Sequence, residues 1–297
     1  MSHEAIIESL GKPFYQQRDC LIYNMDCLEA MEKLPEGMFH LTVTSPPYNI
    51  GKEYEQTTTP TEYVQWCKQW IGEVHRITHA QGAFWLNLGY MTAPTAKALP
   101  IAYLLWDQTP FYMIQEVVWH YGAGVAGRHF YSPRNEKFLW YVKSQKHYTF
   151  NLDDVRDPDV KYPNQKKNGK LKVNPLGKNP TDVWEFPKVT SGHNRSSKER
   201  TAHPAQFPEA VIERVVRASS NPCEIILDPF LGSGTTAVVA LKQNRSVVGF
   251  EVRRDYCEIA ACRVERLASE EDQAGLNRPQ AQPNLFGAWL AAHEGGV

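Results

Sequence analysis

Several features that mark common classes of protein are absent from this sequence of 297 residues. No apolar run reaches the roughly 18 residues that a membrane-spanning helix needs, and Met1–Glu4 carries no basic and apolar leader. The six cysteines include no Cys-x-x-Cys pair, which excludes the usual metal and disulfide frameworks. Lys and Arg number 32 against 33 Asp and Glu, so a net charge of −1 provides no general basic field for nucleic acid. We therefore expect a cytoplasmic protein without a membrane segment or a metal, in which any nucleic-acid site is a local patch.

Among the features that are present, a glycine-rich turn is the most informative. The nine residues 228–236 read Asp-Pro-Phe-Leu-Gly-Ser-Gly-Thr-Thr and connect an apolar run, predicted to be a strand, to a helix-prone run. Gly232 and Gly234 permit positive φ and let a ligand approach the backbone, while the start of the helix offers unpaired N–H groups. The spacing matches neither the dinucleotide fingerprint nor a P-loop, so a pyrophosphate is not the expected ligand.

An acidic residue, Glu251, ends the next apolar run at 246–250. An acid at the tip of the strand after such a turn is where an α/β fold hydrogen-bonds ribose hydroxyls. The turn and the acid together imply a cofactor that carries a nucleoside. The glycine turn by itself fits an ordinary tight turn equally well, so this interpretation depends on a second motif.

That second motif is Thr44-Ser-Pro-Pro-Tyr-Asn49, which follows an apolar run at 39–43. Two consecutive prolines end the predicted strand in a stiff, extended turn. Such a turn fixes the Ser45 hydroxyl and the Pro46 carbonyl as acceptors and presents the flat ring of Tyr48 beside them. This set suits an exocyclic amine on a planar base, although a proline-rich loop at a strand end remains the simpler alternative.

Together, Ser45-Pro-Pro-Tyr48 and Asp228-Pro-Phe-Leu-Gly-Ser-Gly234 resemble the motifs of amino-methylating DNA methyltransferases that use S-adenosyl-L-methionine. The order, with the catalytic motif first, is similar to that of the circularly permuted β group, and about residues 20 to 265 fit its layout. The resemblance implies a doubly wound, seven-stranded Rossmann-like α/β sheet with an antiparallel last strand. It also implies S-adenosyl-L-methionine as cofactor and double-stranded DNA as partner.

The resemblance assigns roles to individual residues. Ser45, Pro46, Pro47 and Tyr48 would form the catalytic turn. The cofactor site would consist of Asp26, Asp228, Phe230, Gly232, Ser233, Gly234, Thr235 and Glu251. In this assignment Asp26, which also suits a helix N-cap, lies near the adenine, Glu251 holds the ribose, and the glycine turn approaches the methionine part. Two further family likenesses are weaker: Asn135-Glu136 for the base pocket, and the segment from His203 beside the methionine end.

The pattern of apolar runs predicts seven strands, near 21–25, 40–44, 83–88, 112–119, 138–143, 224–228 and 246–250. Thr59-Pro-Thr-Glu62 has the form of a capping box and should start a helix with Trp66 and Trp70 in the core. A second helix is expected near 95–106, and 1–19 should be irregular. These elements suggest a catalytic half at 20–150, a recognition region at 151–202, a cofactor half at 203–268 and a disordered tail at 269–297.

The recognition region is locally basic, because 161–200 holds ten Lys and Arg against three Asp and Glu. A charge run is most often a solvated loop, but a long irregular stretch inside a compact domain is usually functional. A basic excess in a neutral chain suits contacts with phosphates. The residues expected to contact DNA are Lys166, Lys167, Lys170, Arg195, Lys198 and Arg200.

The target base is predicted from one residue. In the resembled family, Ser before Pro-Pro-Tyr is commoner in cytosine-N4 enzymes, whereas Asp or Asn is commoner in adenine-N6 enzymes. Ser45 therefore favours cytosine N4, adenine N6 is the alternative, and an RNA or protein methyltransferase is a more distant one. A restriction endonuclease is a candidate partner of such an enzyme. Gln282-Pro-Asn-Leu-Phe286 resembles a motif that binds the bacterial sliding clamp.

Overall fold

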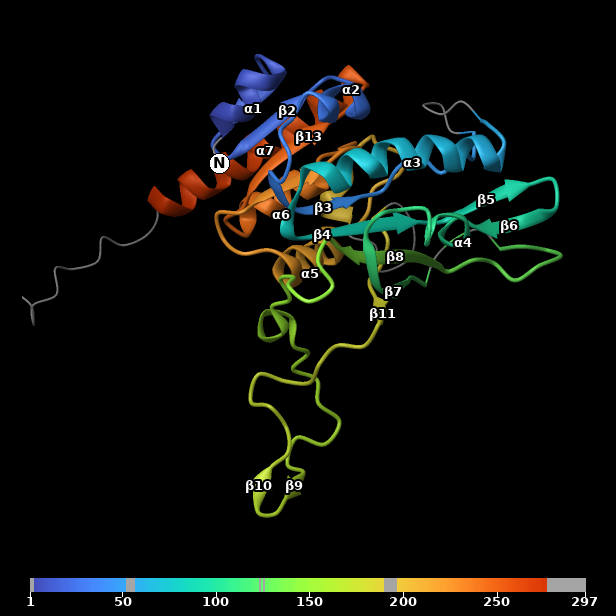
Figure 1. Cartoon of the computed structure of the whole chain (residues 1–297). Helices are drawn as coiled ribbons and strands as arrows, with labels where there is room; N and C mark the ends of the chain where they lie inside the picture. Colours follow the sequence, from blue (N-terminus) through green and yellow to red (C-terminus); the bar gives the residue numbers. More distant parts are fainter. Residues whose placement is uncertain (1–2, 52–56, 123, 125, 190–196, 277–297) are drawn as a thin grey trace, which may run out of the picture.

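A computed structural model describes residues 3–51, 57–122, 124, 126–189 and 197–276. Among these, a nine-stranded sheet forms the centre of the molecule (Figure 1). Its strands, in spatial order, are β1 (Tyr15–Gln17), β2 (Cys20–Tyr23), β13 (Ser246–Phe250), β12 (Ile225–Asp228), β3 (Phe39–Thr44), β4 (Thr78–Leu88), β8 (Asn135–Val142), β7 (Tyr112–His120) and β11 (Val183–Glu185). All seven predicted strands are present, and the short edge strands β1 and β11 are additional.

The direction of the strands largely matches the expected topology. Neighbours from β2 to β4 pair in parallel, whereas β8 is antiparallel to both β4 and β7. Strands β2 and β12 are buried at every position and are apolar except for Asp228 at the end of β12, which is typical of parallel strands covered on both faces. The doubly wound, mostly parallel α/β sheet is therefore confirmed. The antiparallel strand is not the last one, because β13 pairs in parallel with β12 and β2, whereas β8 and the short edge strand β1 run antiparallel to their neighbours.

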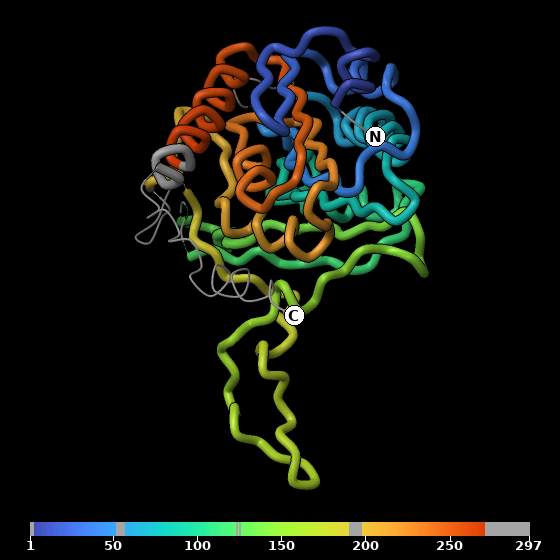
Figure 2. Tube along the Cα trace, turned by 90° about the vertical axis from the view of Figure 1, so that its left-hand side faces the viewer, coloured from blue at the N-terminus to red at the C-terminus, as the bar shows by residue number. Residues whose placement is uncertain are grey.

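Helices cover both faces of this sheet (Figures 1 and 2). One buried cluster lies under α1 (His3–Leu10), α2 (Cys27–Glu32) and α3 (Pro60–Ile77), and the other under α5 (Glu209–Ser219), α6 (Thr235–Lys242) and α7 (Arg254–Leu276). Within β2, Leu21 belongs to the first cluster, while Cys20 and Ile22 belong to the second. Successive strand residues point to opposite faces, so a strand that is apolar throughout holds two helical layers together.

The start of α3 follows the predicted capping box. The Glu62 backbone N–H donates to Thr59 Oγ1 at 3.3 Å, and Glu62 Oε2 accepts from the Thr59 backbone N–H at 2.8 Å. Pro60 occupies the first turn, where its missing N–H costs nothing. Of the two tryptophans on this helix, Trp70 is fully buried, but Trp66 is only partly buried.

Two local predictions were wrong. The stretch 95–106 is not one helix, because the hairpin of β5 (Tyr90–Ala93) and β6 (Ala96–Pro100) precedes a single helical turn, α4 (Ala102–Leu105). Pro100 lies inside the predicted helix and lacks the N–H that a helix interior requires, whereas it is tolerated at the end of β6. Residues 1–19 are not irregular either, since they include α1 and β1.

Residues 151–189 leave the sheet and return to it as an arm that extends from the body of the molecule (Figures 1 and 2). The arm begins with a 3-10 turn, η1 (Leu152–Val155). At its far end β9 (Lys166–Lys167) and β10 (Lys170–Leu171) form a hairpin. Asn168 and Gly169 both have positive φ, 53° and 77°, which suits a two-residue hairpin turn. The chain then re-enters the sheet as β11, which pairs in parallel with β7.

Candidate active site

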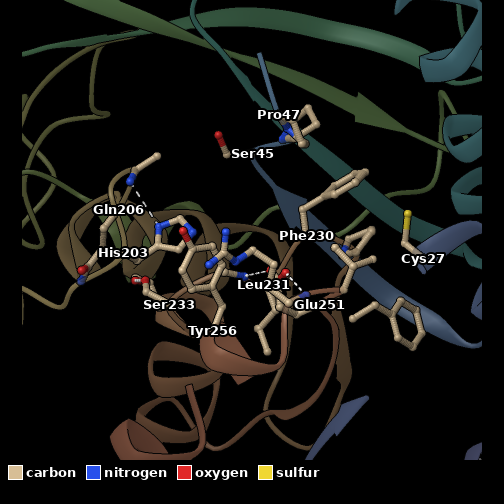
Figure 3. Close-up of a pocket in the computed structure, with 18 of the residues that line it drawn as sticks. Cys27, Ser45, Pro47, His203, Gln206, Phe230, Leu231, Ser233, Glu251 and Tyr256 are labelled. Carbon is tan, nitrogen blue, oxygen red and sulfur yellow. Dashed lines mark hydrogen bonds between the residues drawn. The ribbon is translucent and has the colours of Figure 1, made fainter. Parts of the chain in front are cut away.

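A cavity opens at the carboxyl ends of β2, β13, β12 and β3, where open α/β sheets place their ligands. Most of the residues predicted to be catalytic or to bind the cofactor line it. They are Asp26, Ser45, Pro46, Pro47, Tyr48, Phe230, Gly232, Ser233, Thr235 and Glu251. Ser45 and Pro47 lie across the cavity from Glu251 and Tyr256 (Figure 3). Asp228 and Gly234 do not line the cavity.

The glycine turn has the backbone conformation that its sequence predicts. Gly232 and Gly234 have φ of 51° and 76°, and Gly234 is the N-cap of α6. A Cβ on Gly234 would lie 2.7 Å from the Cβ of Ala260, and a Cβ on Gly232 would lie 2.9 Å from His203 Nε2. Both positions therefore need glycine for their torsion angles and for their close neighbours.

Asp228 supports the turn from below the cavity. Its side chain is 1% exposed, and Oδ1 accepts from Thr44 Oγ1 at 2.6 Å and from the Phe230 backbone N–H at 3.1 Å. Oδ2 accepts from Thr236 Oγ1 at 2.6 Å. Burial raises the pKa of Asp228 to about 6, against the lowering effect of these three hydrogen bonds. The carboxyl group thus connects the end of β3 to the glycine turn.

Glu251 lies in the cavity wall just after β13 and also organises the turn. Its Oε2 accepts from the Gly232 backbone N–H at 3.0 Å, and Oε1 accepts from the Arg253 backbone N–H at 2.8 Å. Burial raises the pKa of Glu251, although both hydrogen bonds oppose that shift. A carboxylate offers about four lone-pair sites, so two backbone bonds leave acceptors for two vicinal hydroxyls of a ribose.

Asp26 is the N-cap of α2 and also a residue of the cavity lining. Its Oδ1 accepts from the backbone N–H groups of Leu28 at 2.9 Å and Glu29 at 3.2 Å, which caps α2.

Aromatic rings form another part of the lining. The Phe230 ring packs against Trp66 and Trp70, with centroid distances of 5.7 and 5.1 Å. The expectation that both tryptophans belong to the core is confirmed for Trp70. It holds in part for Trp66, which is partly buried and packs against the core but also lines the cavity. Trp66 lies in the second turn of α3, close to the Pro-Pro turn, and helical periodicity alone does not reveal that proximity. The cavity lining therefore includes two aromatic rings, Trp66 and Phe230, as well as the carboxylates of Asp26 and Glu251.

The Ser45–Tyr48 turn is held by contacts from three other elements. The Tyr48 hydroxyl lies 2.9 Å from Ser45 Oγ, and it donates toward Asn87 Oδ1 at 2.9 Å and Glu136 Oε2 at 3.2 Å. Tyr63 of α3 donates a hydrogen bond of 2.7 Å from its hydroxyl to the Pro47 carbonyl. Burial, followed by the charge of Glu136, raises the pKa of Tyr48 well above 10, so its phenol stays neutral.

Several residues of this site were not assigned a role from the sequence. Asn87 is a polar residue within the apolar run of β4, and that interruption was a usable signal. A Cβ on Gly89 would lie 2.8 Å from Tyr48 Cε2, so this glycine leaves space for the ring. Glu136 was noted only for its family likeness. Tyr63 and Trp66 carried no local signal beyond their place on the inner face of α3.

His203 lies beside the glycine turn, within the segment that leads into α5. Its Nδ1 accepts from the Ala205 backbone N–H at 3.2 Å, so the neutral ring carries its proton on Nε2, the atom nearest Gly232. The ring packs edge-on against Tyr256, with centroids 4.4 Å apart. Both residues line the cavity, together with Gln206.

The six residues predicted to contact DNA fall into separate groups. Lys166, Lys167 and Lys170 are exposed on the hairpin at the far end of the arm. Lys198 and Arg200 lie near η2 (Ser197–Glu199), on the segment that precedes His203. Arg195 lies outside the described residues, as do Gln282–Phe286. Within the described part of the chain, no helix is long and apolar enough to cross a membrane.

Comparisons with known proteins agree with this geometry. A family model described as DNA methylase, of the N6 and N4 type, matches residues 39–262. Type II methyltransferase M.ScaI of Streptomyces caespitosus is 65% identical over 264 residues, which cover 89% of this chain and 87% of the relative.

Two solved structures share the fold. The cytosine-N4-specific PvuII DNA methyltransferase superposes with a TM-score of 0.67 at 20% identity and covers 87% of this chain and 93% of its own. TTHA0409 of Thermus thermophilus, solved in complex with S-adenosyl-L-methionine, superposes with a TM-score of 0.56 at 20% identity. It covers 83% of this chain and 93% of its own.

Proposed function

The chain belongs to the N6/N4 DNA methylase family, and from that premise we propose that it methylates the exocyclic N4 amine of a cytosine in double-stranded DNA. Its cofactor is S-adenosyl-L-methionine, and it acts as a methyltransferase of the restriction-modification type. One observation carries the proposal. Ser45 lines the same cavity as Glu251 and the glycine turn, so a base and a nucleoside-bearing cofactor can meet there.

The residues of the cavity fit this cofactor. Glu251 retains acceptors for the ribose hydroxyls, and Trp66 and Phe230 provide an apolar aromatic wall for the adenine beside Asp26. The glycine turn lets the methionine part approach the backbone near His203. When bound, S-adenosyl-L-methionine supplies an electrophilic methyl group on a sulfonium. We assign Asp228 and Gly234 to the support of this site rather than to direct contact.

The catalytic turn would hold the base by its amine. An aromatic amine is a poor nucleophile because its lone pair is delocalised into the ring. Ser45 Oγ and the Pro46 carbonyl can accept its two hydrogens and favour a tetrahedral nitrogen, while the Tyr48 ring provides a stacking face. Catalysis of this kind consists mainly of positioning and fixed electrostatics, and no covalent intermediate on the protein is needed.

Cytosine N4 is favoured over adenine N6 because a neutral Ser45 precedes Pro-Pro-Tyr, which in this family is commoner among cytosine-N4 enzymes. Both bases carry an amine beside a ring nitrogen, so the Ser45 hydroxyl does not sterically forbid adenine. Adenine N6 is therefore the second candidate, and the same two acceptors would serve it.

The arm is suited to contact with the duplex. Its hairpin carries Lys166, Lys167 and Lys170, all exposed, at the end of the arm that lies away from the body of the molecule (Figure 1). Lys198 and Arg200 form a second group of basic side chains, on the segment that leads to His203. We propose that these groups bind phosphates on either side of the target base. A cognate restriction endonuclease and a sliding clamp that binds Gln282–Phe286 are further partners in this proposal.

The test is to incubate the protein with mixed-sequence duplex DNA and methyl-labelled S-adenosyl-L-methionine, digest the DNA, and identify the methylated nucleoside by mass spectrometry. N4-methylcytosine is the expected product. N6-methyladenine would preserve the reaction class but overturn the choice of base. Matched RNA serves as the control, and label in RNA rather than DNA would overturn the substrate class.

A further inference from the structure

Behind the catalytic turn lies a carboxylate that the mechanism above does not use. Glu136, near the start of β8, has a side chain that is only 16% exposed. Its Oε2 accepts from the Tyr48 hydroxyl at 3.2 Å, and Oε1 lies 3.5 Å from the Tyr121 hydroxyl and 3.6 Å from Lys188 Nζ. A largely buried carboxylate is costly unless it is paired and hydrogen-bonded, and these three groups, from separate parts of the chain, meet that requirement.

The hydrogen bonds between Ser45, Tyr48 and Glu136 have a defined direction. Glu136 is an acceptor, and so is Asn87 Oδ1, because Asn87 Nδ2 donates to the Lys137 carbonyl at 3.3 Å. The single proton of the Tyr48 hydroxyl is therefore directed to these two acceptors. Its oxygen is left to accept from the Ser45 hydroxyl, 2.9 Å away. Ser45 Oγ then has lone pairs, and no proton, to present to an amine in the cavity.

Methyl transfer leaves a proton to be removed. When the amine nitrogen gains a methyl group and the sulfonium loses it, the nitrogen becomes cationic and must release one of its protons. Neither Ser45 nor Tyr48 can be the final base, because both hydroxyls are neutral. A serine hydroxyl is far less acidic than a phenol, and the pKa of Tyr48 is raised well above 10 by burial and by Glu136. Both hydroxyls can only pass a proton on, so the acceptor must lie beyond them.

We propose that Glu136 is the terminal proton acceptor for the amine and acts through Tyr48 and Ser45. This inference rests on the proposed function. The amine N–H proton moves to Ser45 Oγ, the Ser45 proton moves to the Tyr48 oxygen, and the Tyr48 proton moves to Glu136 Oε2. One proton has then passed from the amine to the carboxylate, both hydroxyls are neutral again, and Glu136 later loses its proton to water. Before the proton is transferred, the negative charge of Glu136 also stabilises the positive charge that develops on the amine.

The other groups around Glu136 are consistent with this role. Burial is the main cause that raises the pKa of both Tyr90 and Tyr121, and the charge of Glu136 adds to it, so both phenols stay neutral. Lys188 is a cation that pairs with the carboxylate, and its Nζ lies 3.8 Å from the centre of the Tyr121 ring. The adjacent Lys137 pairs instead with Glu116 of β7, 3.6 Å away.

The experiment measures the rate of a single turnover of methyl transfer in the preformed complex of protein, S-adenosyl-L-methionine and duplex DNA, across a pH range of about 6 to 9. Glu136→Gln keeps the size of the side chain but removes the proton acceptor. We expect the single-turnover rate to fall about 100-fold near neutral pH, which is the scale of general base catalysis, with cofactor and DNA affinities unchanged within about twofold. The variant's rate should rise with pH as hydroxide replaces the carboxylate, whereas the wild-type rate should be nearly flat.

Two further variants separate proton transfer from a structural effect. Tyr48→Phe keeps the ring but interrupts the same path, so adding Glu136→Gln to it should lower the rate no further. Glu136→Ala leaves space for a small carboxylate, and added formate should restore part of its rate. Glu116→Gln, which removes a neighbouring carboxylate outside the path, is the matched control and should behave as wild type.

The outcomes distinguish this inference from the proposed function. If the wild type methylates no amine on DNA, the proposed function fails. If the wild type is active and Glu136→Gln transfers the methyl group within about threefold of its rate, Glu136 is not the acceptor. Rate losses that add fully in the double variant, together with no rescue of Glu136→Ala by formate, would also overturn the inference and leave Glu136 as a structural residue.

Discussion

The Thr44 hydroxyl donates a hydrogen bond of 2.6 Å to the Asp228 carboxyl group and joins two motifs that lie 184 residues apart in the chain. Thr44 is the last residue of β3, directly before the catalytic turn, and Asp228 is the last residue of β12, directly before the turn to Gly232 and Gly234. The two strands are parallel neighbours. This bond therefore fixes the position of the catalytic turn relative to the cofactor turn.

Asp228 should make the stability of the protein depend on pH in an unusual direction. Its pKa is raised to about 6 in the folded state from 3.8, so the folded protein binds the proton more tightly than the unfolded chain. Its contribution is fully present below about pH 4 and is lost as the pH rises through about 6, a change of about 3 kcal/mol. Asp228→Asn should remove this component, as measured by the difference between wild-type and variant urea unfolding at several pH values between about 4 and 7. A difference that does not change with pH would contradict the assignment.

Alanine at the second turn glycine should be costly for two reasons. Gly234→Ala imposes a positive φ on a residue with a Cβ and also meets the Ala260 Cβ and Cα at 2.7 and 2.9 Å. We expect it to destabilise the fold by about 3 kcal/mol, because the backbone strain and the clash add. Gly11→Ala is the control for strain alone, since its φ is 78° and nothing lies within 4 Å of the new Cβ. Its cost in thermal or urea unfolding should be about 1 kcal/mol, and equal losses in both variants would contradict the packing argument.

Substitutions of Trp66 and Trp70 should affect cofactor binding and stability to different degrees. Trp70 is fully buried, so Trp70→Ala should cost about 3 to 5 kcal/mol of unfolding free energy. Trp66 lines the cavity, and Trp66→Ala should cost less stability but weaken S-adenosyl-L-methionine binding by about tenfold through lost aromatic contact. Isothermal titration gives the affinity, and Trp66→Phe should recover most of it. Unchanged affinity in Trp66→Ala would show that the ring does not contact the cofactor.

Tyr63 should support turnover without contacting the substrate. Tyr63→Phe removes the hydrogen bond to the Pro47 carbonyl and leaves the ring in place. We expect a loss of about 1 kcal/mol in stability and a fall of about tenfold in kcat, because the catalytic turn loses one of its anchors. Cofactor affinity, measured by titration, should be nearly unchanged. A large loss of cofactor affinity with normal kcat would instead place Tyr63 in the cofactor site.

The lysines of the arm should set part of the salt dependence of DNA binding. Replacing Lys166, Lys167 and Lys170 with Gln removes three exposed charges at the far end of the arm. The slope of log affinity against log salt should become shallower by about 2 to 3, since each phosphate contact contributes about 0.9. The matched control replaces Lys12, Lys33 and Lys68, which are exposed on the body of the molecule. Equal slopes in the two triple variants would show that the arm does not bind phosphates.

The sequence by itself determined the seven central strands, the capping box of α3, the glycine turn and the Ser-Pro-Pro-Tyr turn. Each of these depends on residues close together in the chain, where apolar runs, prolines, glycines and caps restrict the backbone directly. The carboxyl ends of parallel strands meet at one edge, so four predicted residues, Asp26, Ser45, Asp228 and Glu251, could also be expected to gather there. The structure places them at that edge.

Only the tertiary structure decided which side chains complete the site. Glu136 and Asn87 reach the Tyr48 hydroxyl because the antiparallel β8 lies beside β4 in the sheet, and that pairing brings together residues far apart in sequence. Trp66 packs against the core and also lines the cavity because of where α3 crosses the sheet, which helical periodicity cannot show. The hairpin at 90–100 formed because strand pairing between its two halves outweighed a helical pattern that Pro100 interrupts. Residues close together in the chain therefore determined the conformation of the turns, whereas contacts between distant segments determined which side chains surround those turns.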